Sequence, residues 1–323
     1  MKESQMQTVA VIGAGMMGPG IAQVFAARGH SVRVQDVAEE RLAPVVDRVR
    51  ANLGKMADYA LVEAACIPAI LNRITVTRDM AAACAGADIV IEAITENLGL
   101  KQELFAELDR ICSRDAILCS NTSVISITRI GERASHRERI LGTHFYQPPF
   151  LVPLVEVVRT EFTAPRCMDL VFDLLRDAGK VPVRVQKDVP GFIANRMQHA
   201  LWREAFALID EGICDAETVD IAVRNSFGMR LPVLGPAANA DMVGLDLTLA
   251  IHDYVLPYLN ASPLPSTTLR AAVARNELGF KTGSGFLKWT EESIAAAREQ
   301  LATHLLETLS RSSNAVHPRE GGK

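Results

Sequence analysis

A glycine-rich turn between an apolar strand and an apolar helix constrains this chain more than any other feature. Residues 9–12 form a short apolar strand pattern, and the sequence GAGMMG follows at once over 13–18. An apolar segment with helical spacing covers 21–27, and a second strand pattern over 31–35 ends at Asp36. A strand, a glycine turn, a helix and a strand that ends in an acid form the unit that binds dinucleotides.

The turn supplies the groups that the pyrophosphate of a dinucleotide needs. Gly13 permits the tight turn, Gly15 lets backbone N–H groups approach the phosphates, and Gly18 lets the helix pack closely against the strand. Met16 and Met17 lie between these glycines, and we expect them to contact the cofactor as part of the same turn. The helix that follows directs the partial positive charge of its N-terminus at the phosphates.

Asp36 indicates which dinucleotide the site takes. A carboxylate at the end of the second strand accepts hydrogen bonds from both ribose hydroxyls, and its charge would repel a 2′-phosphate, so NAD is favoured over NADP. The alternative is a glycine-rich turn in an ordinary α/β domain. Because the strand, turn, helix and acid all occur in order, the sequence favours an NAD site.

Composition and charge exclude several other classes of protein. Apolar residues make up 49% of the chain and charged residues 22%, which is typical of a folded protein with a sizeable core. The formal net charge of −4 offers no basic field to nucleic acid or to an anionic membrane surface. The N-terminus lacks a signal sequence, and no apolar run approaches the roughly 20 residues of a membrane span. We therefore expect a cytoplasmic protein whose partner is a small molecule and not nucleic acid or a membrane.

The six cysteines are scattered, without a CxxC pair and without histidines at metal-ligand spacing. This distribution predicts small core residues in a reducing compartment and no metal site.

Strand and helix patterns alternate up to about residue 185. After the two strands that flank the first helix, strand patterns recur at 74–76, 87–94, 116–119, 140–145, 154–158 and 181–185. Such alternation predicts an α/β fold with a Rossmann-type, doubly wound and largely parallel sheet. Ligands of these sheets bind beyond the carboxyl ends of the strands, where Glu96, Ser123 and His144 are expected.

The pattern changes at residues 187–191, and the 323 residues suit two domains. From Phe192 onward there is little strand pattern, and amphipathic helices are predicted over 192–210 and 216–225. Apolar helical material is expected over 241–259, and a last helix over 291–309. We therefore predict an NAD-binding domain over 1–188, an all-α C-terminal domain over 189–309, and a polar, mobile tail over 310–323.

His144 is the strongest candidate for the proton transfer that accompanies hydride transfer. Histidine is the usual proton carrier, and among the seven histidines only His144 ends a strand pattern of the first domain. His136 lies in a polar stretch that we expect to be exposed. Glu156 lies inside the next apolar strand pattern, where a charge needs a partner. From the residues alone, a structural His144–Glu156 pair and a catalytic one are both open.

These two residues lie in motifs that resemble the L-3-hydroxyacyl-CoA dehydrogenase family. The motifs read HFYQPP from His144 onward and LVEVV over 154–158. Four more motifs of that family occur in its order, and with the glycine turn they extend the resemblance over nearly the whole chain. They are EAITENL at 92–98, SNTS at 120–123, DVPGFIANR at 188–196 and KTGSGF at 281–286.

The resemblance implies an activity and the roles of two residues. It implies an NAD-dependent enzyme of fatty acid metabolism that oxidises the 3-hydroxyl of a short L-3-hydroxyacyl-CoA to the 3-keto product. It assigns His144 as the general base and Glu156 as the residue that orients it. It also implies a helical second domain that binds substrate and forms a homodimer.

Four further residues receive roles from the resemblance. Ser123 and Asn195 would hydrogen-bond the substrate, and Glu96 and Lys101 would lie near the ribose and nicotinamide of the cofactor. Simpler roles remain open for three of them. Ser123 is a candidate N-cap of the next helix, Asn195 a helix-terminal hydrogen-bonder, and Lys101 a solvated lysine on a helix face.

Three positions differ from the pattern of the acyl-CoA enzymes and indicate a second possible class of substrate. Gln147 stands where acyl-CoA enzymes usually carry Asn, and Lys55 is the only lysine in the segment over 52–59 expected to meet the CoA phosphates. Arg230 resembles a position in relatives that oxidise free 3-hydroxy acids, such as L-gulonate and L-carnitine dehydrogenases. An arginine can hold a carboxylate through two parallel hydrogen bonds, although Arg230 could equally stabilise its loop or a subunit contact.

A different class of function is a non-catalytic NAD-binding or structural relative of the family. Since His144, Glu156, Ser123 and Asn195 are all present, the sequence favours the enzyme.

Overall fold

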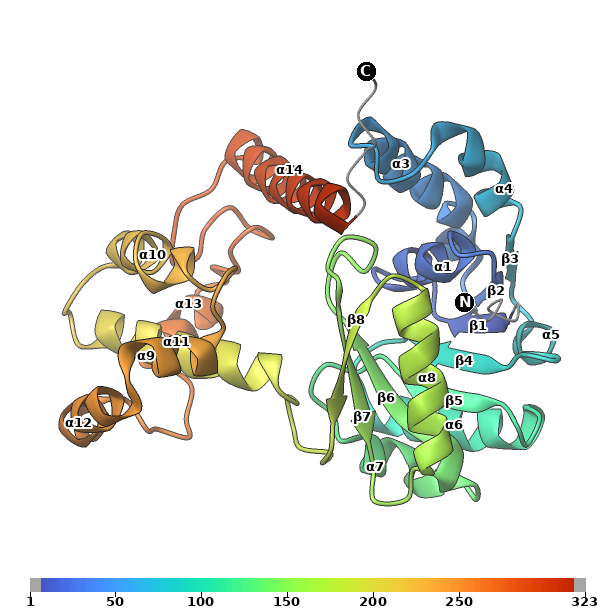
Figure 1. The fold of residues 1–323 in the computed structure, drawn as a ribbon, viewed down its shortest axis with the longest axis horizontal. Coiled ribbons are helices and arrows are strands. Elements are labelled where there is room, and N and C mark those ends of the chain that lie inside the picture. The colour runs from blue at the N-terminus through green and yellow to red at the C-terminus, as the bar shows by residue number, and fades with distance from the viewer. Residues whose placement is uncertain (1–6, 317–323) are drawn as a thin grey trace. The chain divides into compact units, whose positions relative to one another are not determined.

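Eight strands form one sheet in the first part of the chain, as the computed structural model shows for residues 7–316 (Figure 1). Their order is β3-β2-β1-β4-β5-β6-β7-β8, and all pairs from β3 to β6 are parallel. β7 runs antiparallel to β6, and β8 runs parallel to β7. The strands are β1 (Thr8–Ile12), β2 (Ser31–Gln35), β3 (Ile74–Thr77), β4 (Ile89–Glu92), β5 (Ile117–Ser120), β6 (Ile140–Phe145), β7 (Leu154–Arg159) and β8 (Val181–Val185).

Helices cover both faces of this sheet. Along β1, Val9 and Val11 belong to one buried apolar cluster and Ala10 and Ile12 to another, because successive side chains of a strand point to opposite faces. The first cluster includes side chains of α1, α3, α4 and α8, and the second includes those of α5, α6 and α7. The predicted doubly wound α/β fold is confirmed. These helices are α1 (Gly18–Ala26), α2 (Glu39–Leu42), α3 (Val45–Asp58), α4 (Ile67–Leu71), α5 (Met80–Cys84), α6 (Leu98–Ile111), α7 (Ile127–Ile130) and α8 (Pro165–Asp177).

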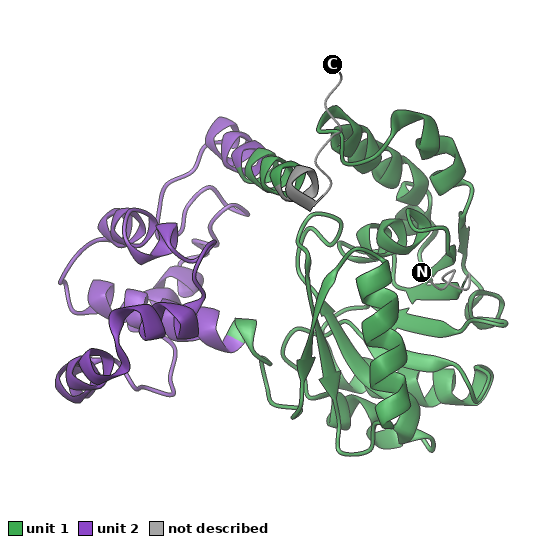
Figure 2. Ribbon diagram, in the orientation of Figure 1, with its two compact units in different colours: residues 1–195, 301–323 green, residues 196–300 purple. Residues whose placement is uncertain are grey.

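The chain divides into two compact units, residues 1–195 with 301–323 and residues 196–300 (Figure 2). Among the described residues, the regular structure of the second unit is helical apart from isolated β-bridges near residue 284. This agrees with the predicted all-α C-terminal domain. The division falls inside α9, a few residues beyond the boundary that we place at 188, and the domain ranges stay predictions. The helices from residue 194 onward are α9 (Ala194–Asp210), α10 (Ala216–Arg224), α11 (Pro236–Val243), α12 (Leu245–Val255), α13 (Thr267–Ala274) and α14 (Glu291–Val316), and α14 begins in the second unit and ends in the first.

α14 ends later than the sequence pattern predicted. The predicted end at Leu309 is wrong, because the helix continues to Val316. Arg311 lies one turn after Glu307 and pairs with it at 3.7 Å, and no proline or glycine interrupts the chain before Pro318. The first seven residues of the predicted mobile tail over 310–323 are therefore helical. The rest of that tail, residues 317–323, lies outside the described residues.

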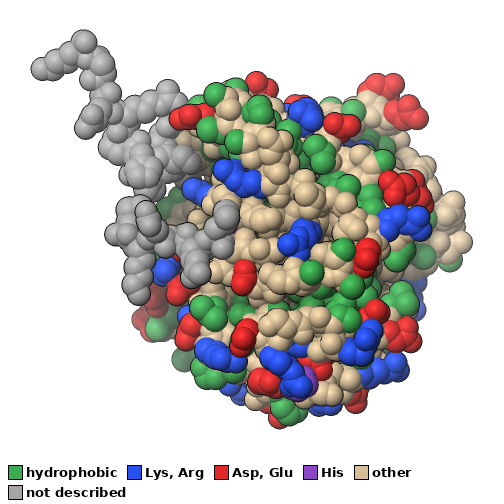
Figure 3. All heavy atoms as spheres, turned by 90° about the vertical axis from the view of Figure 1, so that its right-hand side faces the viewer, with side chains coloured by type: hydrophobic (Ala, Val, Ile, Leu, Met, Phe, Trp, Pro, Cys, Tyr) green, Lys and Arg blue, Asp and Glu red, His purple; other side chains and the backbone are tan. Residues whose placement is uncertain are grey.

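The surface of the first unit carries charges of both signs. In the face shown in Figure 3, on the side where α4, β3 and α5 lie, basic and acidic side chains are interspersed. Among the described residues, no helix combines the length and the apolar character that crossing a bilayer requires. Four of the six cysteines lie in the core as expected, but Cys66 is exposed and Cys214 is half-buried.

Candidate active site

The glycine turn after β1 has a backbone that only glycine fits at two positions. Gly13 has a φ of +110°, and a Cβ there would lie 2.6 Å from the carbonyl oxygen of Ala93. A Cβ on Gly18 would lie 1.9 Å from the carbonyl oxygen of Gly13. Gly15, by contrast, faces open space, so a ligand can approach its backbone directly.

The N-terminus of α1 follows this turn and suits an anion. Its N-cap, the half-buried Met17, has no side-chain oxygen that could cap the helix, so N–H groups of the first turn remain available to phosphate. Met16, the preceding residue, is 70% exposed.

Asp36 lies beside the turn at the end of β2. Its Oδ2 accepts from the Ala14 amide at 2.9 Å and its Oδ1 from the Ala38 amide at 3.0 Å, and Arg41 lies 3.7 Å from Oδ2. The carboxylate therefore fixes the turn against β2. The open turn, the uncapped helix and this acid together fit a dinucleotide.

A buried ion pair lies at the carboxyl end of β4. Glu92 is fully buried and Lys101, from α6, is 1% exposed, with 2.5 Å between Nζ and Oε1. The Ser120 hydroxyl donates to the other Glu92 oxygen at 2.6 Å, and the Ile94 amide donates to Oε1 at 2.8 Å. Lys101 is thus no solvated surface lysine, and that alternative is wrong.

Glu96 links this ion pair to the loop after β5. Lys101 Nζ lies 3.3 Å from its Oε2, while Oε1 accepts from the Thr122 hydroxyl and from the Ser123 amide at 3.1 Å. Burial works to raise the pKa of the Glu96 carboxyl, but Thr122, Lys101 and Ser123 together hold that pKa below its usual value. Glu96 therefore stays ionised while 39% of its side chain remains exposed.

Ser123 is exposed in the loop between β5 and α7. The N-cap of α7 is Ser126, whose hydroxyl accepts from the Arg129 amide at 3.3 Å, so the alternative cap role of Ser123 is wrong. Asn195, near the start of α9, donates from Nδ2 to the Ser123 carbonyl at 3.1 Å. The structure thus brings Ser123 and Asn195 together.

His144 and Glu156 face each other across β6 and β7. They are direct partners in the antiparallel register, with 2.8 Å between His144 Nδ1 and Glu156 Oε2. His144 is 3% exposed and Glu156 is fully buried. Since a carboxylate can only accept, Nδ1 carries the proton, and Nε2 of the neutral ring has a free lone pair.

Three further donors hold the Glu156 carboxylate. Tyr146 donates from its hydroxyl to Oε2 at 2.9 Å, and the Ile193 and Ala194 amides donate to Oε1 at 2.8 and 2.9 Å. Burial works to raise the pKa of Glu156, but His144, the two amides and Tyr146 hold that pKa below its usual range. Burial and the charge of Glu156 raise the pKa of the Tyr146 phenol, so the hydroxyl remains a donor.

The chain before α9 bends sharply to present these two amides. Gly191 and Phe192 both have positive φ, +77° and +49°, and the buried Phe192 ring lies 5.7 Å from the His144 ring. Sequence reasoning missed Tyr146, Phe192 and Glu92. Glu92 was detectable by the rule that selected Glu156, because both are charges inside apolar strands.

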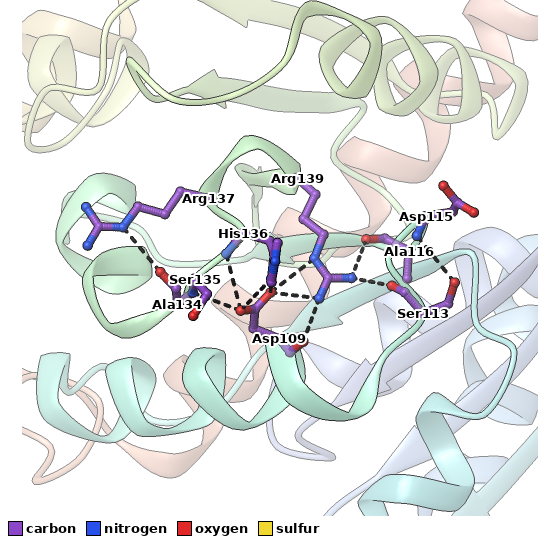
Figure 4. A network of polar contacts seen from close by, with 9 residues as sticks. All are labelled: Asp109, Ser113, Asp115, Ala116, Ala134, Ser135, His136, Arg137 and Arg139. Atoms are coloured by element: carbon purple, nitrogen blue, oxygen red, sulfur yellow. Dashed lines mark hydrogen bonds and ion pairs between the residues drawn. The ribbon is translucent and has the colours of Figure 1, made fainter.

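A second histidine–carboxylate pair lies at the other end of β6 (Figure 4). His136 Nδ1 lies 3.1 Å from Asp109, and Arg139 binds the same carboxylate at 2.8 Å. His136 is half-buried and not simply exposed, contrary to the sequence expectation. Because it precedes β6, it lies away from the carboxyl ends where His144 lies.

Arg230 belongs to the second unit. It lines a cavity of about 680 Å³ whose walls are mostly apolar side chains, among them Leu231 and Ile251. Lys55 and Gln147, the other two departures from the family pattern, are exposed in the first unit.

Comparison with known proteins identifies the family. The model of the NAD-binding domain of 3-hydroxyacyl-CoA dehydrogenase matches residues 8–189, and that of its C-terminal domain matches residues 191–289. The chain belongs to the 3-hydroxyacyl-CoA dehydrogenase family. As a member of this family it is an NAD-dependent oxidoreductase, so the predicted enzyme class and cofactor are confirmed.

Relatives in this family carry different substrate names. The chain is 37% identical to the pig mitochondrial hydroxyacyl-coenzyme A dehydrogenase over 295 residues, 89% of this chain and 93% of that one. It is 33% identical over 302 residues to a 5-formyl-3-hydroxy-2-methylpyridine 4-carboxylate 5-dehydrogenase of Mesorhizobium japonicum, covering 93% and 96%. A crystal structure of an enzyme of that same name matches with a TM-score of 0.86 and 32% identity, over 98% of this chain and all of that one.

We predict that Lys101→Met lowers the free energy of unfolding by about 3–5 kcal/mol, because it leaves Glu92 charged and buried without its cation. The double variant Glu92→Gln with Lys101→Met removes the unpaired charge and should recover most of that loss. Urea unfolding of the three proteins measures both effects. A loss below about 1 kcal/mol in the single variant would contradict the buried ion pair.

Proposed function

We propose that this dehydrogenase oxidises the hydroxyl of a 3-hydroxyacyl substrate with His144 as the general base. The observation that carries the proposal is the 2.8 Å contact between His144 Nδ1 and the buried Glu156, which leaves Nε2 free to accept a proton. NAD, when bound, accepts the hydride. Nε2 takes the hydroxyl proton, and the negative charge of Glu156 stabilises the imidazolium that results. In the reverse direction, the imidazolium returns this proton to the forming alkoxide.

Ser123 and Asn195 are proposed to hold the reacting oxygen. Their proximity supports this proposal. The Asn195 amide donates to the Ser123 carbonyl, which holds the Asn195 side chain beside Ser123. Ser123 is exposed, so a substrate can reach its hydroxyl. For the cofactor, we propose that the turn from Gly13 to Gly18 meets the pyrophosphate and that Asp36 meets the adenosine ribose. Glu96 would face the nicotinamide ribose, and Lys101 would hold Glu96 in place through their ion pair.

We predict that His144→Ala and Glu156→Gln each lower kcat by about 10²–10⁴-fold. A glutamine keeps the size of Glu156 but has no charge to stabilise the imidazolium and can present its NH₂ group to Nδ1. The KM for NAD should stay within about twofold, since neither residue belongs to the proposed phosphate site.

Steady-state kinetics measure both parameters, with Tyr146→Phe as the matched control. That variant leaves Glu156 three of its four donors, so its kcat should fall by about tenfold at most. Full activity of Glu156→Gln would reject the role of the pair. Activity of the wild type combined with its loss in His144→Ala also excludes a non-catalytic relative.

For the substrate, we propose a short L-3-hydroxyacyl-CoA. The supporting observation for the acyl-CoA is that both family models are named for 3-hydroxyacyl-CoA dehydrogenase and the pig relative for hydroxyacyl-coenzyme A dehydrogenase. The short chain and the L configuration rest on the resemblance of the sequence motifs. A second candidate is a small free hydroxy acid whose carboxylate pairs with Arg230. It is favoured by an arginine lining a mostly apolar cavity and by the carboxylate in the name of the Mesorhizobium relative.

We predict NADH production from L-3-hydroxybutyryl-CoA and none from free 3-hydroxybutyrate, L-carnitine, L-gulonate or a substituted pyridine carboxylate. NADH absorbance measures turnover with each compound. Turnover with a free acid alone would contradict the thioester and support the second candidate. In that case Arg230→Met should raise the KM of the acid by about 10–100-fold, since the carboxylate loses its bidentate partner, and leave the KM of NAD unchanged.

We also propose that the helical domain over 189–309 binds substrate and forms a homodimer. Val233, Tyr254 and Tyr258 are 82%, 76% and 77% exposed, and many aliphatic side chains of the same unit are more than half exposed. An apolar surface of this extent on one unit is typical of an interface between subunits. A cytoplasmic location and a role in fatty acid metabolism stay predictions.

Sedimentation equilibrium should therefore give a mass close to twice the 35.1 kDa of one chain. A concentration-independent mass of one chain would reject the dimer. A surface charge such as Val233→Glu should shift the equilibrium toward the monomer if the exposed apolar surface is the interface.

A further inference from the structure

Arg48, on α3, contacts the glycine turn although it lies outside the strand–turn–helix–strand segment that ends at Asp36. Its Nη1 donates to the Gly15 carbonyl at 3.0 Å, and its Nη2 donates to the Met16 carbonyl at 3.5 Å. One guanidinium thus binds two consecutive carbonyls of the turn. Arg48 is otherwise exposed, so these contacts do not follow from burial of the residue in the core.

These two contacts determine where the N–H groups of the turn point. In a trans peptide, the carbonyl and the N–H of one unit point in opposite directions. The Gly15 carbonyl shares its peptide unit with the Met16 N–H, and the Met16 carbonyl shares its unit with the Met17 N–H. Because both carbonyls are directed at Arg48, both N–H groups are directed away from it.

The turn has few other means of holding this orientation. A glycine has more conformational freedom than any other residue, and a Cβ at Gly15 would have no neighbouring atom within 4 Å, so packing on that side does not restrain the residue. Met16 is 70% exposed. Ordering such a turn when a ligand binds would cost affinity, which a contact already present in the free protein avoids.

We propose that Arg48 is a positioning residue for the cofactor: it orients the N–H groups of Met16 and Met17 toward the pyrophosphate. The inference rests on the proposed position of the cofactor at the glycine turn. The positive charge of the guanidinium adds to that of the α1 N-terminus and acts in the same direction.

Arg50 provides a matched control on the same helix. It is exposed like Arg48, but it pairs with Asp47 at 3.7 Å within α3. Removing Arg50 deletes the same charge from the same helix without touching the turn.

The test is isothermal titration of ADP-ribose into the full chain and into Arg48→Ala, Arg48→Lys and Arg50→Ala. ADP-ribose contains the pyrophosphate but not the nicotinamide, so the measurement is independent of turnover. We expect Kd to rise about tenfold in Arg48→Ala, to rise less in Arg48→Lys, which keeps the charge but not the planar fork, and to stay within about twofold in Arg50→Ala. The KM for NAD should rise with Kd, while kcat at saturating NAD stays near that of the wild type.

Two results would overturn the proposal. One is an equal change in Arg48→Ala and Arg50→Ala, which would reduce the effect to net charge. The other is an unchanged Kd for ADP-ribose together with a raised KM for the acyl-CoA, which would make Arg48 a contact for the second substrate. Since ADP-ribose binding does not involve His144, failure of the proposed catalytic role leaves this test valid.

Discussion

The buried carboxylate of Glu156 is the interaction on which the proposed site depends. It lies on β7, and its four donors come from β6, from the chain just after β6, and from residues 193 and 194 where α9 begins. All four donors stabilise this charge, which has no exposure to water, because each missing donor would leave a buried acceptor less well satisfied. The hydrogen bond that helps to satisfy this carboxylate also fixes the tautomer of His144, because Nδ1 must carry the proton. The hydrogen bonds that stabilise buried Glu156 in the fold therefore also prepare His144 to accept a proton.

Glu92 repeats this arrangement at the end of β4. Both carboxylates end or occupy apolar strands, both are fully buried, and each is held by side-chain and backbone donors. They differ in the partner that carries charge. Glu92 forms an ion pair with Lys101 at 2.5 Å, whereas the donors described at Glu156 are neutral groups and an imidazole. Only the second carboxylate can stabilise a positive charge that appears during a reaction.

The features that the sequence predicted best are those set by short-range periodicity. The residue ranges expected for β2, β6 and β8 agree with the structure, and the pairing of His144 with Glu156 follows from two neighbouring strands. α5 and α7 are too short to show a helical period. α14 was predicted to end at Leu309, where no glycine or proline stops the helix, and the first proline of that segment is Pro318, just beyond the observed end at Val316. The burial of Lys101 and the positive φ of Phe192 depend on tertiary contacts, which local patterns do not contain.

Two histidines of the first unit contact a carboxylate, and their places in the fold show which of them suits the role of general base. Each imidazole contacts a carboxylate, at 2.8 and 3.1 Å. Asp109, however, is bound by Arg139 through Nη2 at 2.8 Å and by two backbone amides, so its charge is already balanced (Figure 4). A proton gained by His136 would approach an existing cation, while a proton gained by His144 would meet an uncompensated anion. His136 precedes β6, whereas His144 is the last residue but one of that strand. Only His144 therefore combines this electrostatic advantage with the edge of the sheet where ligands bind.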